Sequence, residues 1–396
     1  MKKTLVLGVT GGIAAYKACD LVSSLVKKDV NIQVIMTEHA VKFVSPLTFQ
    51  SLSGNYVTTD MFEEPRSWDI EHIALAKKAD VFAIVPATAN VIGKIAGGVA
   101  DDMLTTTVMA TRAPLVIAPA MNTNMYENPI LQENLEKLKS LGCDIIEPAF
   151  GRLACADVGR GKLADVIEIE ERILFHLNKR ETLEGKKVVI TAGPTREGID
   201  PARYLTNYSS GKMGYALAEQ AALMGAQVTL ISGPVNLRPS SLLQKVTFVS
   251  STQQMYRAAM EEFERADIMI KAAAVSDYRP KNFSDSKVKK KDEELFLELQ
   301  RNPDIAMELG KVKKHQILIG FAAETDDILE NAKKKLDRKN LDFIVLNDIK
   351  QEGAGFNTDT NIAKIISREE IEDCPLMSKA ELSVRILEKA AQLLKH

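Results

Sequence analysis

The chain has 396 residues, which is too long for one ordinary hydrophobic core and predicts two or three domains. Apolar residues make up 45% and charged residues 26%, a composition typical of soluble globular proteins. The formal net charge of −2 comes from 51 basic and 53 acidic residues, so the chain as a whole does not attract nucleic acid or an anionic membrane. Any anion-binding site must therefore be local.

The cysteines and the first residues indicate a cytoplasmic protein. Cys19, Cys143, Cys155 and Cys374 include no pair at metal-ligand spacing and suggest no disulfide framework. The apolar run after Lys3 is interrupted at once by Gly8, so it predicts a strand and not a secretory signal. No apolar run approaches the about 20 residues that span a bilayer. A reducing cytoplasm is the simplest location.

In the first half, short β-branched runs alternate with helical patterns. We expect strands at residues 4–7, 31–36, 81–85, 114–118 and 144–147, with helices such as 14–27 and 129–141 between them. Buried strands separated by helices predict a parallel sheet with helices on both faces.

A glycine-rich turn follows the first expected strand, with Gly8, Gly11 and Gly12 before a helix. Such a turn lets backbone N–H groups approach a phosphate, but a tight turn without a ligand is equally consistent with the pattern. The spacing G-x-x-G-G is not the dinucleotide fingerprint, and Thr37 stands near the position where an NAD site places a carboxylate. The pattern favours a mononucleotide such as FMN over NAD.

Three further segments, 86–90, 100–106 and 119–125, follow apolar runs and are rich in small, hydroxyl and amide side chains. Each alone is explained by a turn or a helix cap, but three at one sheet edge favour a site. His72 is one of five histidines, and a lone histidine beside apolar residues is usually structural. Cys155 lies in the glycine-containing stretch 151–162, which we expect to be a loop, and is a better catalytic candidate than Cys19 or Cys143.

A charged stretch at 178–187 predicts a domain boundary, giving domains 1–187 and 188–396. The second half repeats the alternation, with strands expected at 188–192, 227–231, 268–272, 317–321, 343–346 and 362–366. Residues 195–201 and 234–239 read as loops, and 284–294 as an exposed loop or hairpin. The fold class is therefore α/β, with two flavodoxin-like or Rossmann-like domains, each a mainly parallel sheet with flanking helices.

The second half has lysines in place of a Walker motif. Gly211-Lys212 is not a P-loop, because Thr206 and Met213 stand where that motif needs Gly and Ser/Thr. A second strand–turn–helix is expected to begin at 210–214, where the glycines permit close contact with a ligand. Lys287 begins the K-x-K-K cluster at 287–290, which without context reads as a solvated face. Together with Lys335 and Lys339 and with Asp277 after a strand, it suits a triphosphate.

The first-half segments, taken in order with residues 8–17, resemble the flavoprotein cysteine-decarboxylase family. More closely, they resemble the decarboxylase half of the bacterial bifunctional phosphopantothenoylcysteine decarboxylase/phosphopantothenate–cysteine ligases. The resemblance implies that His72 is an active-site histidine, that Asn122 binds the substrate carboxylate, and that Cys155 donates a proton. This sequence departs at Thr88, Tyr126 and Ala156, where the family often has Ser, Trp and Gly. The expected FMN-binding residues are Thr10, Gly11, Gly12, Ile13, Thr37, Thr88, Thr105, Thr106 and Met121.

The second half resembles the ligase half of the same family. The resemblance implies that Asn207 stabilises an acyl-cytidylate and that Lys287 assists the activation. Mg²⁺ would accompany the triphosphate, with Asp277 as a ligand. The residues expected to bind CTP are Lys271, Ala272, Ala273, Asp277, Lys287, Asn302, Pro303, Asp304, Ile305, Phe321, Lys335 and Lys339.

The resemblance implies two consecutive steps of coenzyme A biosynthesis, with 4′-phosphopantothenate, cysteine and CTP as substrates. The ligase product is the decarboxylase substrate, so the two interpretations support each other. It also implies a dodecamer of decarboxylase trimers joined through ligase dimers, with no nucleic-acid or membrane partner. A nicotinamide-dependent oxidoreductase is the alternative enzyme, against which the absent fingerprint counts. A non-catalytic flavin-binding subunit would need neither Cys155 nor the lysines.

Overall fold

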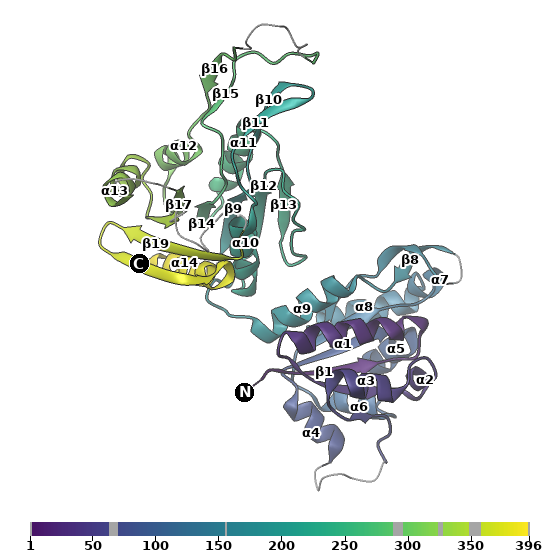
Figure 1. Cartoon of the computed structure of the whole chain (residues 1–396). Coiled ribbons are helices and arrows are strands. Elements are labelled where there is room, and N and C mark those ends of the chain that lie inside the picture. Colours follow the sequence, from purple (N-terminus) through teal and green to yellow (C-terminus); the bar gives the residue numbers. More distant parts are fainter. Residues whose placement is uncertain are drawn as a thin grey trace. The chain divides into compact units, whose positions relative to one another are not determined.

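The computed structural model describes residues 2–62, 70–154, 157–287, 296–323, 328–347 and 358–394. The chain divides into two compact units, Met1–Asn178 and Lys179–His396 (Figure 1). Each has its own sheet and its own buried core. Within the described ranges, none of the helices combines the length and apolar character needed to cross a lipid bilayer.

The first unit is built on a six-stranded parallel sheet in the order β3-β2-β1-β4-β5-β6. Its strands are β1 (Thr4–Val9), β2 (Asn31–Met36), β3 (Val57–Thr58), β4 (Val81–Ala87), β5 (Leu115–Pro119) and β6 (Asp144–Ile145). The strand order reverses between β1 and β4, and ligands of open α/β sheets bind at such a point, beyond the carboxyl ends of the strands.

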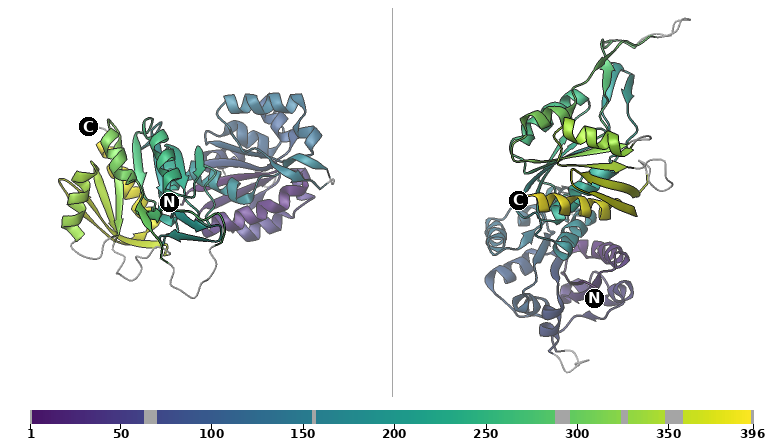
Figure 2. Two further views of the ribbon diagram at one scale, coloured as in Figure 1. Left: turned by 90° about the horizontal axis from the view of Figure 1, so that it is seen from above. Right: turned by 90° about the vertical axis from the view of Figure 1, so that its left-hand side faces the viewer.

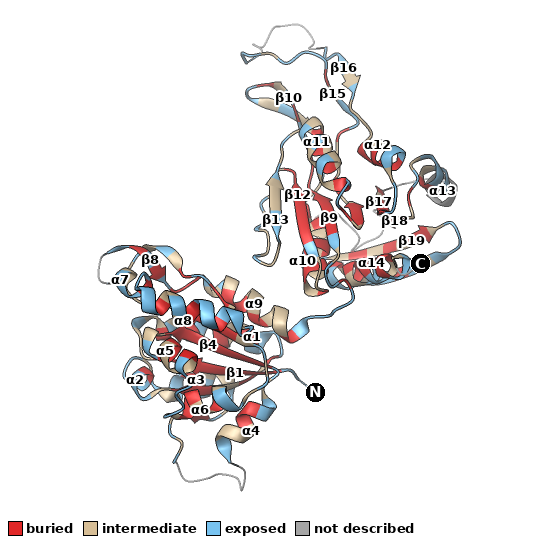
Figure 3. Ribbon diagram, turned by 180° about the vertical axis from the view of Figure 1, so that it is seen from behind, coloured by how far each residue is buried: buried red, intermediate tan, exposed pale blue. Residues whose placement is uncertain are grey.

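Helices cover both faces of this sheet, because successive strand side chains point to opposite sides. Leu5 and Leu7 of β1 pack with one group of helices, α1 (Lys17–Lys27), α3 (Pro46–Ser53) and α9 (Val166–Asn178). Val6 packs with the other group, α4 (Glu71–Lys78), α5 (Ala89–Gly97), α6 (Met103–Ala110) and α8 (Pro129–Ser140). Figure 3 shows the result as buried strands under helices whose outer sides are exposed.

The second unit has an eight-stranded sheet in the order β13-β12-β9-β14-β17-β18-β19-β20. The first six strands are parallel, and β19 and β20 are antiparallel additions at one edge (Figure 2). The strands are β9 (Lys187–Ala192), β12 (Gln227–Ser232), β13 (Lys245–Phe248), β14 (Ile268–Lys271), β17 (Ile317–Ala323), β18 (Phe343–Asn347), β19 (Thr360–Ser367) and β20 (Ile371–Ser378). The predicted α/β class with mainly parallel sheets is thus confirmed.

Helices again cover both faces of the second sheet. On one side lie α10 (Lys212–Leu223) and α14 (Lys379–Leu393), and on the other α11 (Thr252–Phe263), α12 (Ile305–Val312) and α13 (Ile328–Arg338). The charged segment before β9 belongs to this unit. Leu183 is fully buried in its core, and its backbone N–H donates to Met224 O at 2.9 Å.

Two expected loops are instead antiparallel hairpins. In the second unit, β10 (Arg196–Asp200) pairs with β11 (Arg203–Thr206), so the loop expected at 195–201 is wrong. The carboxylate of Asp200 accepts the backbone N–H groups of Ala202 and Arg203 at 2.8 and 3.0 Å, which reverses the chain. In the first unit, β7 (Ala149–Arg152) pairs with β8 (Val158–Lys162) where a loop was expected.

The lysine-rich stretch near 287 is only partly described. β15 (Tyr278–Pro280) pairs with β16 (Leu299–Arg301), so the chain leaves and re-enters this region as an antiparallel pair of strands. Lys287 is exposed, and the expected cluster members Lys289 and Lys290 lie outside the described residues.

Candidate active sites

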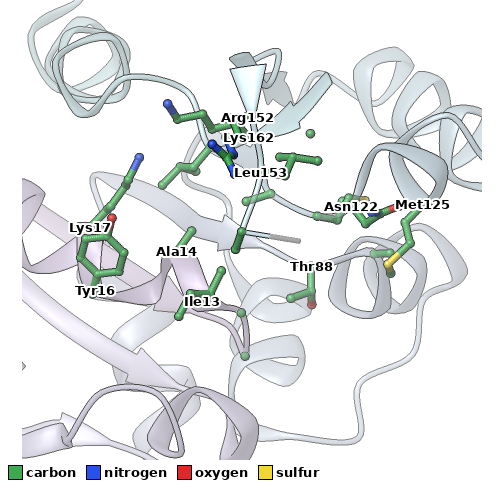
Figure 4. A pocket seen from close by; sticks show the side chains of 18 residues that line it. Ile13, Ala14, Tyr16, Lys17, Thr88, Asn122, Met125, Arg152, Leu153 and Lys162 are labelled. Atoms are coloured by element: carbon green, nitrogen blue, oxygen red, sulfur yellow. The ribbon is translucent and has the colours of Figure 1, made fainter. Parts of the chain in front are cut away.

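A cavity of about 630 Å³ lies at the carboxyl edge of the first sheet (Figure 4). Its walls come from the turn after β1, from the turn after β4, from the segment after β5, and from the β7–β8 hairpin. The lining residues are Gly11, Gly12, Ile13, Ala14, Tyr16, Lys17, Thr88, Ala89, Ala120, Met121, Asn122, Met125, Arg152, Leu153, Ala154, Gly161, Lys162 and Leu163. Most of this surface is apolar, and its cations are Lys17, Arg152 and Lys162.

The glycine-rich turn is shaped by packing beneath the cavity. A Cβ atom added to Gly11 would lie 2.3 Å from the Cβ of His39, so no larger residue fits at that position. Thr10 is fully buried, and its hydroxyl donates to Pro86 O at 2.7 Å and accepts from the backbone N–H of Thr88 at 3.0 Å. Thr10 therefore joins the ends of β1 and β4 under the cavity, while Gly11 and Gly12 line it.

Replacing Thr10 by Val should destabilise the first unit by about 2–4 kcal/mol, because Pro86 O and the Thr88 N–H would be buried without partners. Denaturant unfolding of the full chain can be followed by far-ultraviolet circular dichroism. Thr10→Ser keeps the hydroxyl and is the matched control. An unchanged unfolding midpoint in Thr10→Val would contradict the role of this hydroxyl.

Asn122 has a fixed orientation at the cavity wall. It is the N-cap of the short helix α7 (Thr123–Tyr126), and its side-chain oxygen accepts the backbone N–H of Asn124 at 2.8 Å. The side-chain nitrogen donates to a carboxylate oxygen of Asp157 at 3.0 Å. Tyr126, at the end of α7, donates its hydroxyl to Glu147, and burial together with this carboxylate raises the pKa of Tyr126 to about 12.

The cavity unites six of the residues expected to act in this unit, namely Gly11, Gly12, Ile13, Thr88, Met121 and Asn122. Thr37 does not line it, since its hydroxyl caps α2 (Glu38–Val41). His72 on α4 and Thr105 and Thr106 on α6 do not line it either, and these two helices pack on each other. Cys155 lies outside the described residues.

The cationic residues of this cavity were not predicted from sequence. Arg152 and Lys162 come from β7 and β8, and Lys17 from the first turn of α1. Recognising two strands in the stretch 149–162 would have predicted that Arg152 and Lys162 lie on one hairpin. The glycines in this stretch argue against strands, so the pattern was not recognised.

The second unit has a cavity of about 470 Å³ at the carboxyl edge of its sheet. Three lysines line it: Lys271 at the end of β14, Lys335 on α13, and Lys339 directly after α13. Burial and the charge of Lys339 lower the pKa of Lys271 to about 8. Asn207 donates its side-chain N–H to Val275 O at 2.9 Å, which holds the turn after β11 against the segment after β14.

Eight of the residues expected in this unit line the cavity, namely Lys271, Ala272, Ala273, Asp277, Phe321, Lys335, Lys339 and Asn207. Five others, Lys287, Asn302, Pro303, Asp304 and Ile305, do not. Asn302 holds the adjoining turn, since its side-chain nitrogen donates to Ser276 O at 2.9 Å. Asp304 caps α12 and pairs with Lys339 at 2.8 Å, and Ile305 is fully buried in the core.

A further part of the lining was predicted only in part, because the turn and helix start at 210–214 were expected to contact a ligand, whereas Asn347, Asn361 and Lys379 were not expected at the site. It includes the turn 208–211, the first turn of α10 with Lys212, and Asn347, Asn361 and Lys379. Gly211, with φ 78°, begins α10 without a side-chain cap. The amide oxygen of Asn347 is buried and has no hydrogen-bond partner among the described residues. The turn and helix start expected at 210–214 thus line the cavity, although the segment is not a P-loop.

Two family models together cover the chain. The model described as Flavoprotein matches residues 1–177, and the DNA/pantothenate metabolism flavoprotein C-terminal domain matches residues 183–394. The coenzyme A biosynthesis bifunctional protein CoaBC of Bacillus subtilis (strain 168) is 52% identical over 396 residues, covering 99% of this chain and 98% of that protein. A cysteine/cysteine sulfinic acid decarboxylase from an unknown prokaryotic organism is 46% identical over 357 residues, covering 88% of this chain and 99% of that protein.

Among solved structures, the crystal structure of the C-terminal domain of a CoaBC protein is 42% identical, with a TM-score of 0.48. It covers 54% of this chain and 98% of that chain. The full-length sequence relatives and the two family models agree with the resemblance read from the sequence. The chain belongs to the family of coenzyme A biosynthesis bifunctional proteins CoaBC, in which a flavoprotein decarboxylase domain is followed by a ligase domain.

Proposed function

We propose that this chain catalyses two consecutive steps. The ligase domain, 188–396 by the sequence boundary, joins cysteine to 4′-phosphopantothenate with CTP through an acyl-cytidylate. The decarboxylase domain, 1–187, then converts 4′-phosphopantothenoylcysteine to 4′-phosphopantetheine. The observation that carries this proposal is that each unit has its own cavity at the carboxyl edge of its sheet, lined by the segments that resemble the corresponding half of the family.

The first cavity suits FMN. It is large enough for a mononucleotide, its apolar wall fits a flat ring, and the Gly11–Gly12 turn offers backbone N–H groups to a phosphate. Bound FMN would supply reversible two-electron oxidation of the substrate, which gives the electrons of the broken carboxyl bond an acceptor. Residues of the turn, with Thr88 and Met121, would hold it. Thr10 would support the turn from below.

The remaining polar groups of this cavity suit an acidic, phosphorylated substrate. The side-chain nitrogen of Asn122 is positioned to donate to the substrate carboxylate, and Cys155 would hold the proton that completes the product. Figure 4 shows Lys17, Arg152 and Lys162 gathered at the other end from Thr88 and Asn122. These cations suit the phosphate of the substrate and favour 4′-phosphopantothenoylcysteine over free cysteine.

The second cavity suits a triphosphate and a second anion. Lys271, Lys335 and Lys339 stabilise negative charge on the phosphates, and Asn207 would stabilise the acyl-cytidylate. The start of α10, whose N-cap Gly211 has no side chain, also lines this cavity and suits the phosphate of 4′-phosphopantothenate. No group of three His, Cys, Asp or Glu side chains able to hold a metal occurs in the described part of the chain. Mg²⁺ would therefore arrive on the triphosphate, with Asp277 as one ligand.

We infer that the decarboxylase site is completed by a second copy of the chain, within the dodecamer implied by the family. His72, Thr105 and Thr106 are on α4 and α6 and do not line the cavity of their own unit. Exposed apolar side chains accompany them, with Ile70 64% and Met109 56% exposed, which suits burial against a neighbouring copy. The enzyme would act in the cytoplasm, where its thiol product stays reduced.

The proposed function is tested by mass spectrometry of the products. The purified protein is given 4′-phosphopantothenate, cysteine, CTP and Mg²⁺, after its flavin absorbance has been recorded. We expect a yellow protein that forms 4′-phosphopantetheine and CMP. A folded protein with neither flavin nor product would return the nicotinamide alternative to consideration.

The affinity of the second cavity for CTP should depend on the charge of Lys271. Its pKa is about 8, and a bound triphosphate would raise it, so above pH 8 binding must be accompanied by proton uptake. Affinity is therefore full below pH 8 and decreases as pH rises through that value, by up to about tenfold per pH unit. Calorimetry over this range should give a flat profile for Lys271→Arg, whose charge is permanent. An equally steep profile for Lys271→Arg would contradict the assignment.

A further inference from the structure

The side-chain amide of Asn122 is hydrogen-bonded to the carboxylate of Asp157. Its nitrogen donates to Asp157 at 3.0 Å, while its oxygen accepts the backbone N–H of Asn124 at 2.8 Å. The amide cannot turn over without losing the N-cap of α7, so the nitrogen is the end that stays available to a partner. Asn122 lines the cavity (Figure 4). The side-chain nitrogen of Asn122 can therefore bind only a hydrogen-bond acceptor, and in this structure the acceptor is the Asp157 carboxylate.

The backbone places Asp157 over Asn122 independently of the Asp157 side chain. The backbone N–H of Leu153 donates to Asp157 O at 2.8 Å, and the backbone N–H of Met121 donates to Gly161 O at 2.9 Å. A Cβ added to Gly161 would lie 2.4 Å from Met121 O, so the β8 strand approaches the segment after β5 as closely as backbones allow. The bond to Asn122 therefore follows from the docking of the hairpin.

This docked arrangement leaves one polar group unsatisfied. The hydroxyl oxygen of Thr123, next to Asn122, is buried and lacks a hydrogen-bond partner within the described part of the chain. A Cβ added to Gly159 would lie 2.5 Å from that oxygen, so the strand covers it closely. Burying an unpaired hydroxyl costs free energy. The hairpin is thus docked on Asn122 in an arrangement in which the Thr123 hydroxyl has no hydrogen-bond partner among the described residues.

We propose that Asp157 is an internal competitor for the substrate carboxylate. It occupies the Asn122 amide in the free enzyme, and the carboxylate of 4′-phosphopantothenoylcysteine must displace it. This inference rests on the proposed function, in which Asn122 binds that carboxylate. Because the reaction removes the carboxylate as CO2, the product cannot occupy the amide, and Asp157 returns to it. Asp157 therefore stabilises the free and product-bound enzyme relative to the substrate complex, and makes affinity depend on whether a ligand still has its carboxylate.

Two unreactive ligands test this competition in the full-length flavin-bound protein. 4′-Phosphopantothenoylserine has a hydroxyl in place of the thiol, and 4′-phosphopantothenoylethanolamine is the same molecule without the carboxylate. Asp157→Ala should bind the serine ligand about tenfold more tightly than the parent, since a charge-assisted hydrogen bond no longer competes. It should bind the ethanolamine ligand within about twofold of the parent. Calorimetry measures both.

A second variant separates charge from folding. Asp157→Asn keeps an acceptor of the same size without the charge, and should tighten binding of the serine ligand by about threefold. Retained flavin absorbance verifies that either variant is folded in the unit that contains Asp157. Unchanged or weaker binding of the serine ligand in the folded variants would overturn the proposal. Turnover of 4′-phosphopantothenoylcysteine by the parent protein is recorded separately, so failure of the proposed function is distinguished from failure of the competition.

Discussion

Replacing Lys287 by Gln should reduce CMP release by at least about 10³-fold and leave the decarboxylation of supplied 4′-phosphopantothenoylcysteine at the parental rate. By resemblance, Lys287 assists the attack of the pantothenate carboxylate on the α-phosphorus of CTP. The positive charge would stabilise negative charge that develops at phosphorus, and an amide cannot replace it. Decarboxylation should be unaffected because the two cavities belong to units with separate cores. The measurement is product analysis of each half-reaction.

The same strand pair provides a matched control. Lys281 is just past β15, is exposed, and pairs with Glu298 at 2.6 Å. A surface ion pair of this kind contributes little to stability, so Lys281→Gln should keep both activities. Loss of ligation in both variants would assign the effect to the stability of the strand pair. Loss of decarboxylation in Lys287→Gln would contradict the independence of the two units.

The parallel sheets could be predicted because their signal is local and repeated. β1 and β4 are short, largely apolar runs that are each followed by a helical pattern, which is typical of parallel strands whose carboxyl ends share one edge of a sheet. Thr88 and Asn122 were accordingly expected at one edge, and the structure places both on one cavity. The alternation of apolar strands and helices along the sequence was therefore sufficient to predict the parallel sheets.

The β7–β8 hairpin could not be predicted, because its backbone packs closely against a segment elsewhere in the fold. β8 consists of Val158-Gly159-Arg160-Gly161-Lys162, whose glycines argue against a strand. Those glycines are needed because the strand lies against Met121 and Thr123. The direction of the Thr10 hydroxyl likewise depends on Pro86, far along the chain. The glycines that allow this close backbone approach therefore make the strand look like a loop in the sequence.

Co-expression of His72→Ala and Asn122→Ala subunits should restore decarboxylation that neither variant has alone. Each single substitution should reduce turnover by about 10²-fold or more. His72 is on α4 and does not line the cavity that contains Asn122, so the proposed site combines Asn122 of one copy with His72 of another. Random assembly then gives both wild-type residues in about a quarter of the sites, and activity should recover to about that fraction.

Two affinity tags, one on each variant, allow mixed oligomers to be purified. The control is a mixture of the two variants purified separately and combined only in the assay, which should stay inactive if subunits do not exchange. Mixed oligomers as inactive as the single variants would place His72 and Asn122 in one subunit's site and would remove the reason for a shared cavity. Recovery would instead explain why Thr105 and Thr106 occur among the segments that resemble the family, although they do not line the cavity of their own unit. Because α6 packs on α4, a rotationally symmetric interface would present both helices to the neighbouring copy.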